Sequence, residues 1–132
     1  MSKVIKLRST IVAALRAVHP RVYYQRAPDG APYPYLVYEL PNSNDQGDLE
    51  QFVLDVDGWD RPAVQGDSTQ LEQLMAAVDE ALDRRVVTVD GTPMVIYRET
   101  RLPLEDDDVR LLRRKYVYQV RVFEKVRGYH NG

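Results

Sequence analysis

Apolar residues recur at steps of three and four in two segments of the chain, which is the spacing of an amphipathic helix. The first stripe consists of Val4, Leu7, Ile11, Leu15 and Val18. A proline disfavours helical backbone in the residue before it, so the pair at 19–20 ends this helix. We interpret the segment as a helix that covers a sheet. Its lysine and arginine residues leave a membrane-surface helix as the alternative.

The second helical segment spans residues 66–85. Ser68 is a typical helix-start residue, and Thr69 and Glu72 have the spacing of a capping box. The apolar stripe of this segment consists of Leu71, Leu74, Met75, Val78 and Leu82. These features together predict a second amphipathic helix.

Alternating apolar and polar positions predict β-strands between and after the helices. Residues 22–25 and 35–40 form two strands around a turn at Asp29-Gly30, where several prolines hold the connection extended. A half-buried strand follows, with an apolar face at Phe52, Leu54 and Val56. The last strand has an apolar face formed by Tyr116, Tyr118, Val120 and Val122.

Two β-rich runs within residues 86–98 flank Asp90-Gly91, the two-residue signal of a tight hairpin. The element order is then helix, strands, helix, hairpin, strand, with no internal repeat or linker. This order predicts a single α+β domain over residues 1–132, with a mainly antiparallel sheet, two helices packed on one face and a protruding β-hairpin.

Composition and charge narrow the class of protein. The chain has 132 residues, 18 basic and 20 acidic side chains, and a net charge of -2, without the basic surplus typical of nucleic-acid binders. It contains no cysteine, which removes disulfides and thiolate catalysis. No run of about 20 apolar residues occurs, so we expect a soluble protein without a targeting signal.

Candidate catalytic and metal-binding residues are few. His19 precedes a proline and His130 lies near the C-terminus, so neither is well placed as a general base. The acids at 55, 57 and 60 superficially match a calcium loop, but glycine and tryptophan occupy the wrong positions. The glycines form no phosphate-binding fingerprint. We therefore expect no catalytic residue, no metal and no cofactor.

Charge is concentrated in the segment 105–115, where four acids precede four basic residues. The acids are read as a solvated loop or a docking surface, and the basic run with its tyrosines leaves nucleic-acid binding as an alternative. Tyr116 and Tyr118 lie on the apolar face of their strand, which weakens that alternative.

Residues 21–38 carry the series Arg21-Val22-Tyr23, Ala27-Pro28, Gly30 and Pro34-Tyr35-Leu36-Val37-Tyr38. With the element order and length of the chain, this series resembles the tail-completion proteins of long-tailed phages, also called tail terminators or tail-to-head joining proteins. The resemblance implies a structural, non-enzymatic subunit of a ring, a hexamer by expectation, that ends tube growth. Its implied partners are itself, the tail tube protein and head or neck connector proteins, with DNA only passing through the lumen and no membrane. Its implied place is the head-proximal end of the virion tail, after assembly in the host cytoplasm.

Polar loops are the candidate contact surfaces of such a subunit. The candidate residues are Asn42, Asn44, Asp45, Asp90, Gly91, Thr92, Asp106, Asp107, Asp108, Arg110, Arg113 and Arg114. The segment 105–115 has more charge than the family pattern requires, which indicates a partner particular to this phage or prophage. A stand-alone binding or regulatory module and a small enzyme remain the competing functions.

Overall fold

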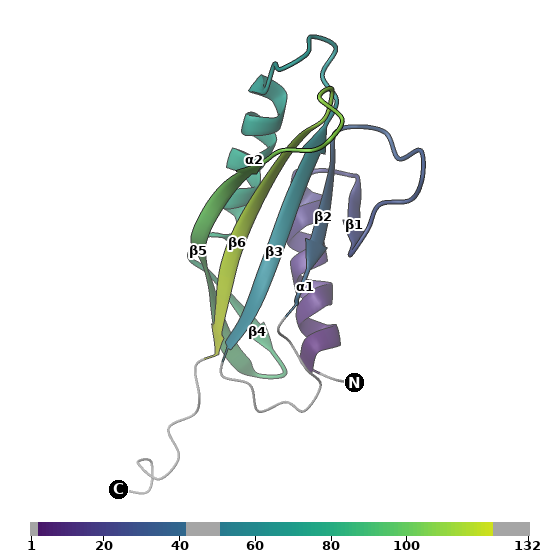
Figure 1. Ribbon diagram of the computed structural model, residues 1–132. Helices are drawn as coiled ribbons and strands as arrows, with labels where there is room; N and C mark the ends of the chain where they lie inside the picture. Colours follow the sequence, from purple (N-terminus) through teal and green to yellow (C-terminus); the bar gives the residue numbers. More distant parts are fainter. Residues whose placement is uncertain (1–2, 42–50, 123–132) are drawn as a thin grey trace, which may run out of the picture.

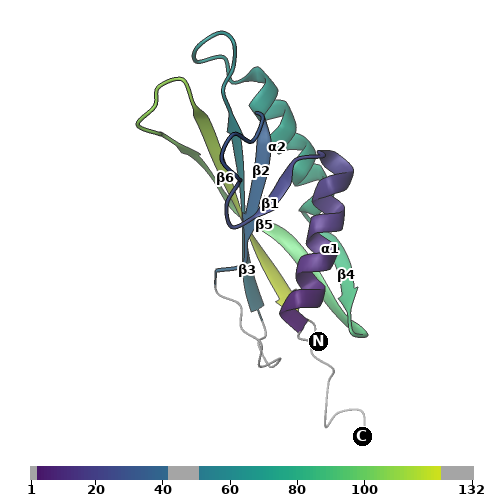
Figure 2. The same ribbon diagram turned by 90° about the vertical axis from the view of Figure 1, so that its right-hand side faces the viewer.

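A computed structural model of the protein describes residues 3–41 and 51–122. Two helices, α1 (Lys3–Val18) and α2 (Thr69–Leu82), cover one face of a six-stranded sheet. Figure 2 shows both helices on the same side of the sheet, and the opposite face carries none of the described helices. The expected α+β fold with two helices on one face is confirmed.

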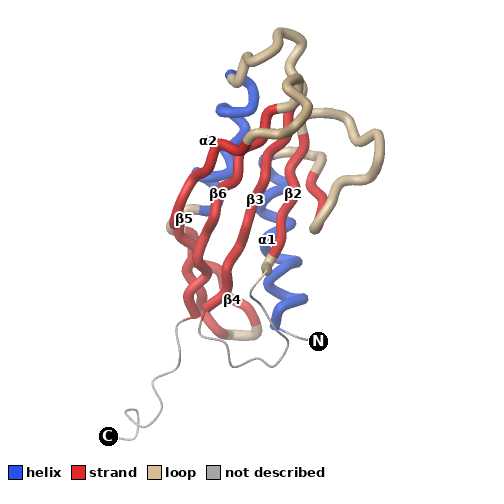
Figure 3. The backbone as a smooth tube through the Cα atoms, viewed as in Figure 1, coloured by secondary structure: helices blue, strands red, loops and turns tan. Residues whose placement is uncertain are grey.

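The strands, red in Figure 3, form one sheet that is mainly antiparallel, as expected. In space its strands follow the order β1-β2-β3-β6-β5-β4. Their bounds are β1 Val22–Tyr24, β2 Tyr35–Glu39, β3 Gln51–Asp60, β4 Arg85–Val89, β5 Thr92–Leu104 and β6 Leu112–Val122. The long strands β3 and β6 are central, so the two edges of the sheet are β1 and β4.

The first two strands are not paired as a hairpin, although two short strands around a turn would suggest one. Strands β1 and β2 run parallel, with Val22 opposite Leu36 and Tyr24 opposite Tyr38. The chain leaves the end of β1, turns at residues 28–31 and returns to the level at which β1 began before β2 starts (Figure 1). The turn is therefore part of a crossover loop and not of a hairpin.

The core is the layer between the helices and the sheet. The apolar helix stripes supply Leu7, Ile11, Leu15, Leu71, Met75, Val78 and Leu82, all of them buried. The facing sheet positions include Leu36, Phe52, Leu54, Val56, Ile96, Tyr118 and Val120, also buried. Each such side chain contributes about 1.5–3 kcal/mol when removed from water. The predicted apolar faces are thus confirmed on both helices, on β3 and on β6.

Gly58 of β3 allows α2 to approach the sheet closely. A Cβ added at this position would lie 2.5 Å from Sδ of Met75 and 3.0 Å from Cδ1 of Leu71. A side chain here would force the Met75 and Leu71 side chains to shift, and overpacking of this kind typically costs about 1–3 kcal/mol.

The start of α2 differs in detail from the expected capping box. Ser68 occupies the N-cap position and makes no side-chain cap hydrogen bond, while Thr69 is already helical. The Thr69 backbone N–H instead donates to Oδ1 of Asp67 over 3.1 Å. The Asp67 carboxylate thus satisfies one N–H at the helix start, and the Glu72 N–H, which a capping-box threonine would have bonded, donates to the Ser68 carbonyl at 2.8 Å.

A polar clamp joins the end of α2 to the sheet. The Asp79 carboxylate accepts a hydrogen bond from the Tyr118 hydroxyl at 2.9 Å and forms an ion pair with Arg98. The Asp83 carboxylate accepts a hydrogen bond from the Arg98 backbone N–H at 2.7 Å. Burial, followed by the hydrogen bond to Asp79, raises the pKa of Tyr118 above its usual range. Because Tyr118 is fully buried at the helix–sheet interface, the bond to Asp79 satisfies a hydroxyl that water does not reach.

Strands β4 and β5 form the expected hairpin around Asp90-Gly91. Both turn residues have positive φ, 54° and 74°, as a tight hairpin turn requires. The inner hairpin residues Val87, Val89 and Met94 are buried in the core, and the turn carboxylate of Asp90 pairs with Lys6 of α1. The hairpin is confirmed, and its projection from the molecule is not.

Candidate functional site

The second hairpin of the fold, formed by β5 and β6, diverges from α2 toward its tip, so that a cleft separates the two. We call residues 100–115 the arm. None of these residues is buried, whereas Met94, Ile96 and Val120 further along the same two strands are in the core. Figure 2 shows the arm curving away from the helix layer. The register of β5 on β6 shifts between Arg98 and Thr100, and such a bulge increases the local bend.

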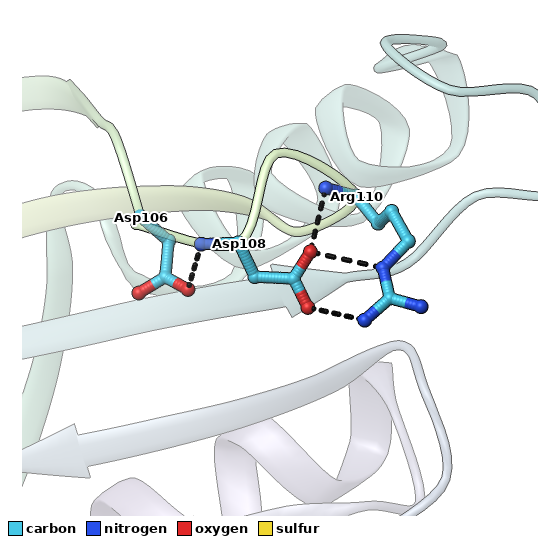
Figure 4. A network of polar contacts seen from close by, with 3 residues as sticks. All are labelled: Asp106, Asp108 and Arg110. Carbon is cyan, nitrogen blue, oxygen red and sulfur yellow. Dashed lines mark hydrogen bonds and ion pairs between the residues drawn. The ribbon is translucent and has the colours of Figure 1, made fainter.

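The tip of the arm is organised by one of the predicted contact residues, Asp108 (Figure 4). Its Oδ1 accepts from the backbone N–H and from Nε of Arg110, at 2.9 and 3.0 Å, and its Oδ2 pairs with the same guanidinium at 2.9 Å. Asp106 accepts from the Asp108 backbone N–H at 3.2 Å. The hydrogen bonds from Arg110 lower the pKa of Asp108 to about 2. Asp108 and Arg110 therefore hold the shape of the turn.

The two arginines after the tip point to opposite faces of the sheet, because side chains alternate along a strand. Arg113 pairs with Asp57 at 2.7 Å on the open face, and Arg114 pairs with Glu72 of α2 at 3.3 Å on the helix face. Within residues 3–41 and 51–122, Asp106 and Asp107 form no ion pair. The sequence grouped Arg113, Arg114, Asp106 and Asp107 in one charged segment, and the structure separates these four residues into three environments.

The remaining predicted contact residues fall into two groups. Asp90, Gly91 and Thr92 form the β4–β5 turn beside α1, where Asp90 pairs with Lys6. The polar loop residues Asn42, Asn44 and Asp45 lie outside the described residues. Contact by any of the twelve candidate residues with another protein stays a prediction.

The open face of the sheet carries an aromatic and charged cluster that the sequence analysis did not single out. Tyr35 stacks between Tyr33 and Trp59, with ring centroids 5.2 and 6.5 Å away, and the Arg113 guanidinium lies 4.8 Å from the Trp59 ring. Burial raises the pKa of Tyr35 to about 12, with Tyr33 adding to the shift. The sequence holds one signal for this face: Trp59 is at an odd-numbered position of β3, whereas the buried residues Phe52 and Val56 are at even-numbered positions, so Trp59 points to the opposite face.

Asp57 is the buried acid of that cluster, only 7% exposed. Arg113 and Lys115 lie 2.7 and 3.9 Å from its carboxylate oxygens. Burial raises the pKa of Asp57, and the hydrogen bond and charge of Arg113 partly oppose this shift. The cluster borders a cleft of about 220 Å³ beneath the residues that follow β1, with Arg26, Glu39 and Lys115 on its walls.

A larger cleft of about 410 Å³ lies between the arm and the start of α2. Its lining residues are Glu72, Ala76, Arg101, Leu102, Pro103, Arg114 and Tyr116. A third hollow of about 500 Å³ follows the arm tip from Pro103 to Arg114. The arm also exposes Leu102 and Val109, which are 39% and 69% exposed. Leu102 lines the cleft beside α2 and Val109 lines the hollow along the arm tip, so each hollow has an exposed apolar side chain on its wall.

Of the residues considered for chemistry, His19, Asp55 and Asp57 have structural partners, and His130 lies outside the described residues. His19 donates from Nε2 to the Pro34 carbonyl at 2.9 Å. Asp55 and Asp57 face the open side and bond to Lys115 and Arg113, while the buried Asp60 lies on the helix side, so these acids do not converge as a calcium loop. Over the described ranges, no group of three potential metal ligands comes together.

The surroundings of α1 and of the β6 tyrosines bear on membrane and nucleic-acid binding. Helix α1 buries Leu7, Ile11 and Leu15 against the sheet and the neighbouring helix, as the interpretation of a covering helix requires. None of the described helices is long and apolar enough to cross a membrane. Tyr116 and Tyr118 are buried, so they do not offer rings for base stacking.

The fold and its surfaces define a small α+β domain with a helix-covered face, an open face and a projecting arm. The family model "Tail completion protein gp17" matches residues 7–122. The chain therefore belongs to this tail completion family, and it is a structural protein of the phage tail class. No curated protein shows significant similarity to it.

Solved structures share the fold. A chain of the virion of a native gene transfer agent particle aligns with a TM-score of 0.58 and 18% identity, over 92% of this chain and 91% of that chain. A second solved chain aligns with a TM-score of 0.61 and 16% identity, over 92% of this chain and 93% of that chain. At these identities the likeness concerns the fold.

Proposed function

We propose that the protein closes as a ring on the end of a phage tail tube, stops the growth of the tube and joins the tail to the head or neck. The family match over residues 7–122 carries this proposal. A further support is that a structural neighbour with the same fold belongs to a gene transfer agent virion. The whole chain, residues 1–132, acts as one domain in this proposal.

The two edges of the subunit are suited to a closed ring. Such a ring needs head-to-tail contacts, in which two unlike patches of each subunit meet. At one edge the short strand β1 is followed by a loop, and near the other edge the arm and α2 enclose a cleft. A subunit with unlike edges favours a ring over a symmetric pair.

The charge of the subunit fits a channel through which DNA slides. The net charge is -2, and cations of the open face are paired with carboxylates of the same subunit, as in Arg113 with Asp57 and Lys115 with Asp55. A basic lumen would hold phosphates by releasing their counterions, which would slow the passage of DNA.

The polar character of the arm tip favours contacts that are weak for each subunit. The tube end then serves as the template, because subunits bound side by side meet at a high effective concentration. In this proposal the partners are further copies of the chain in a hexamer, the tube protein and head or neck connector proteins. The place of action is the head-proximal end of the tail, reached after assembly in the host cytoplasm.

Two competing functions make different predictions. A stand-alone binding or regulatory module would remain monomeric or dimeric and would leave tail structure unaffected by its loss. A small enzyme would need a convergent pocket with an acid or base of shifted pKa beside it. The shifted Asp57 lies in an ion pair with Arg113 on a small open cleft, which favours a structural role for that carboxylate.

The test is to delete the gene from its phage or prophage and to examine lysates by electron microscopy. We expect unjoined heads and tails, with tails that are overgrown or irregular in length. Expression of the wild-type chain from a plasmid should restore joined virions, which controls for effects on neighbouring genes. Fully joined virions of normal tail length after the deletion would overturn the proposal.

A further inference from the structure

The loop after β1 is a well-anchored projection at one edge of the sheet. We call residues 25–34 the proline loop. Pro28, Asp29, Gly30 and Pro32 are exposed at its outer end, which extends sideways from the sheet in Figure 1. Within the described part of the chain, Asp29 has no ion pair.

The base of the proline loop is fixed by several bonds. The Pro34 carbonyl accepts from His19 Nε2 at 2.9 Å and from Arg21 Nε at 3.0 Å. The Ala31 backbone N–H donates to the Pro28 carbonyl at 3.1 Å, and Tyr33 stacks on Tyr35. A loop that is already ordered loses little conformational entropy when it binds, so it is a favourable element for an interface.

The cleft between the arm and α2 lies on the other side of the subunit. Strand β5 is separated from β2 by the two central strands β3 and β6. The cleft of about 410 Å³ has an apolar wall that includes Ala76, Leu102 and Pro103. We call it the arm cleft.

Two of the three charged residues that line the arm cleft pair with each other, and the third has no ion pair among the described residues. Glu72 and Arg114 form an ion pair with each other at 3.3 Å. Arg101 is exposed, lies 6.0 Å from the Tyr116 ring centroid, and has no ion pair among residues 3–41 and 51–122. The uncompensated charge of the cleft is therefore positive, and that of the outer end of the proline loop is negative.

We propose that the proline loop of one subunit occupies the arm cleft of the next copy of the chain, with the Asp29 carboxylate against the Arg101 guanidinium. The prolines and Ala31 contact the apolar wall of the cleft, and the charge pair sets the register of the neighbour. Because the two elements lie on opposite sides of one subunit, the contact is head-to-tail and repeats around a ring. The inference rests on the proposed ring, and it identifies the surfaces that close it.

The first experiment reverses the charges separately and together. Asp29→Arg and Arg101→Asp are each tested, and then combined, for rings on purified tail tubes by electron microscopy and for rescue of the deletion phage. We expect each single reversal to reduce capped tubes and joined virions about tenfold, and the double reversal to recover most of this loss. Glu80→Arg, which changes an exposed charge on α2 by the same amount as Asp29→Arg, should assemble like the wild type.

The second experiment uses the absence of cysteine from the chain. Ala31→Cys and Ala76→Cys place thiols on the proline loop and in the arm cleft. On tube ends under oxidising conditions, the double variant should form a ladder of covalently linked subunits, which denaturing gels resolve. Each single-cysteine variant provides the matched control and should form no such ladder.

The possible outcomes distinguish a failure of the proposed contact between proline loop and arm cleft from a failure of the proposed ring function. If the wild type forms rings while both single reversals assemble normally and the double-cysteine variant stays monomeric, the contact is wrong and the ring stands. Loss of rings in both single reversals without recovery in the double variant also overturns the pairing of Asp29 with Arg101. If the wild type itself forms no ring on tube ends, the proposed function fails first.

Discussion

The two ends of the β5–β6 hairpin use the same strands for different purposes. At one end Met94, Ile96 and Val120 are buried under the helices, and at the other no residue of the arm, 100–115, is buried. The boundary lies near the register shift after Arg98, whose side chain and backbone bond to the end of α2. A strand can therefore supply the core over one part of its length and a contact surface over the rest, depending on where it curves away from the covering helix.

The largest test of this comparison contrasts one apolar residue from each region. Phe52→Ala, in the core, should lower the free energy of unfolding by about 3–5 kcal/mol because it leaves a cavity. Val109→Ser, at the arm tip, should change it by less than about 0.5 kcal/mol. Urea unfolding of the two variants and the wild type measures both values. Comparable losses in the two variants would contradict the division into core and arm.

A second test concerns association, with little change in stability. Asp106→Lys combined with Asp107→Lys should leave the unfolding midpoint unchanged and weaken assembly on tube ends, most strongly at low salt, where charges are least screened. Asp108→Lys should additionally disturb the turn, because Asp108 holds Arg110. Tube-capping assays across a salt series provide the measurement. Equal capping by the Asp106/Asp107 double variant and the wild type would remove the arm tip from the contact surface.

The smallest expected effects concern the pKa values of Asp57 and Asp108, two carboxyls that pair with arginine. These two pKa values should be shifted in opposite directions from the usual value of an aspartate. Asp57 has its pKa raised by burial, so its contribution to stability is fully present below the unfolded pKa, about 3.9, and is lost as pH rises through the higher folded value. Arg110 lowers the pKa of Asp108 to about 2. The contribution of Asp108 to stability is therefore fully present above the unfolded pKa and is lost as pH falls from the unfolded pKa through the lower folded pKa.

Carboxyl carbon chemical shifts measured over a pH series by NMR would follow both groups. The Asp57 midpoint should lie above 3.8 and the Asp108 midpoint well below it. Asp108→Asn and Asp57→Asn provide the assignments. The reverse order of midpoints would show that burial does not govern Asp57.

Much of the fold could be predicted from the sequence because periodicity is a local property. The steps of three and four placed Leu7, Ile11 and Leu15 on one face of α1, and the alternation around Phe52 placed one face of β3 in the core. Asp90-Gly91 required a turn with positive φ at both residues, which the structure has. Each of these features depends on neighbours within a few residues.

The candidate site was predicted only in part. The charged segment was found, but Arg113 and Arg114 depend on partners far away in sequence, Asp57 and Glu72, and lie on opposite faces. The aromatic cluster of Tyr35 and Trp59 forms only because β2 and β3 pair in a particular register. Strand registers and ion-pair partners are set by the packing of segments that are far apart in the sequence, so local patterns do not predict them.

The sequence by itself determined which residues of both helices and of β3 and β6 turn inward, because that choice follows from the period of the apolar positions. Only the tertiary structure decided that β1 runs parallel to β2, that Asp57 is buried beside Arg113, and that β5 and β6 curve away from the helix layer. These outcomes depend on how whole elements meet, since the burial of a side chain is a property of what covers it and not of its own segment.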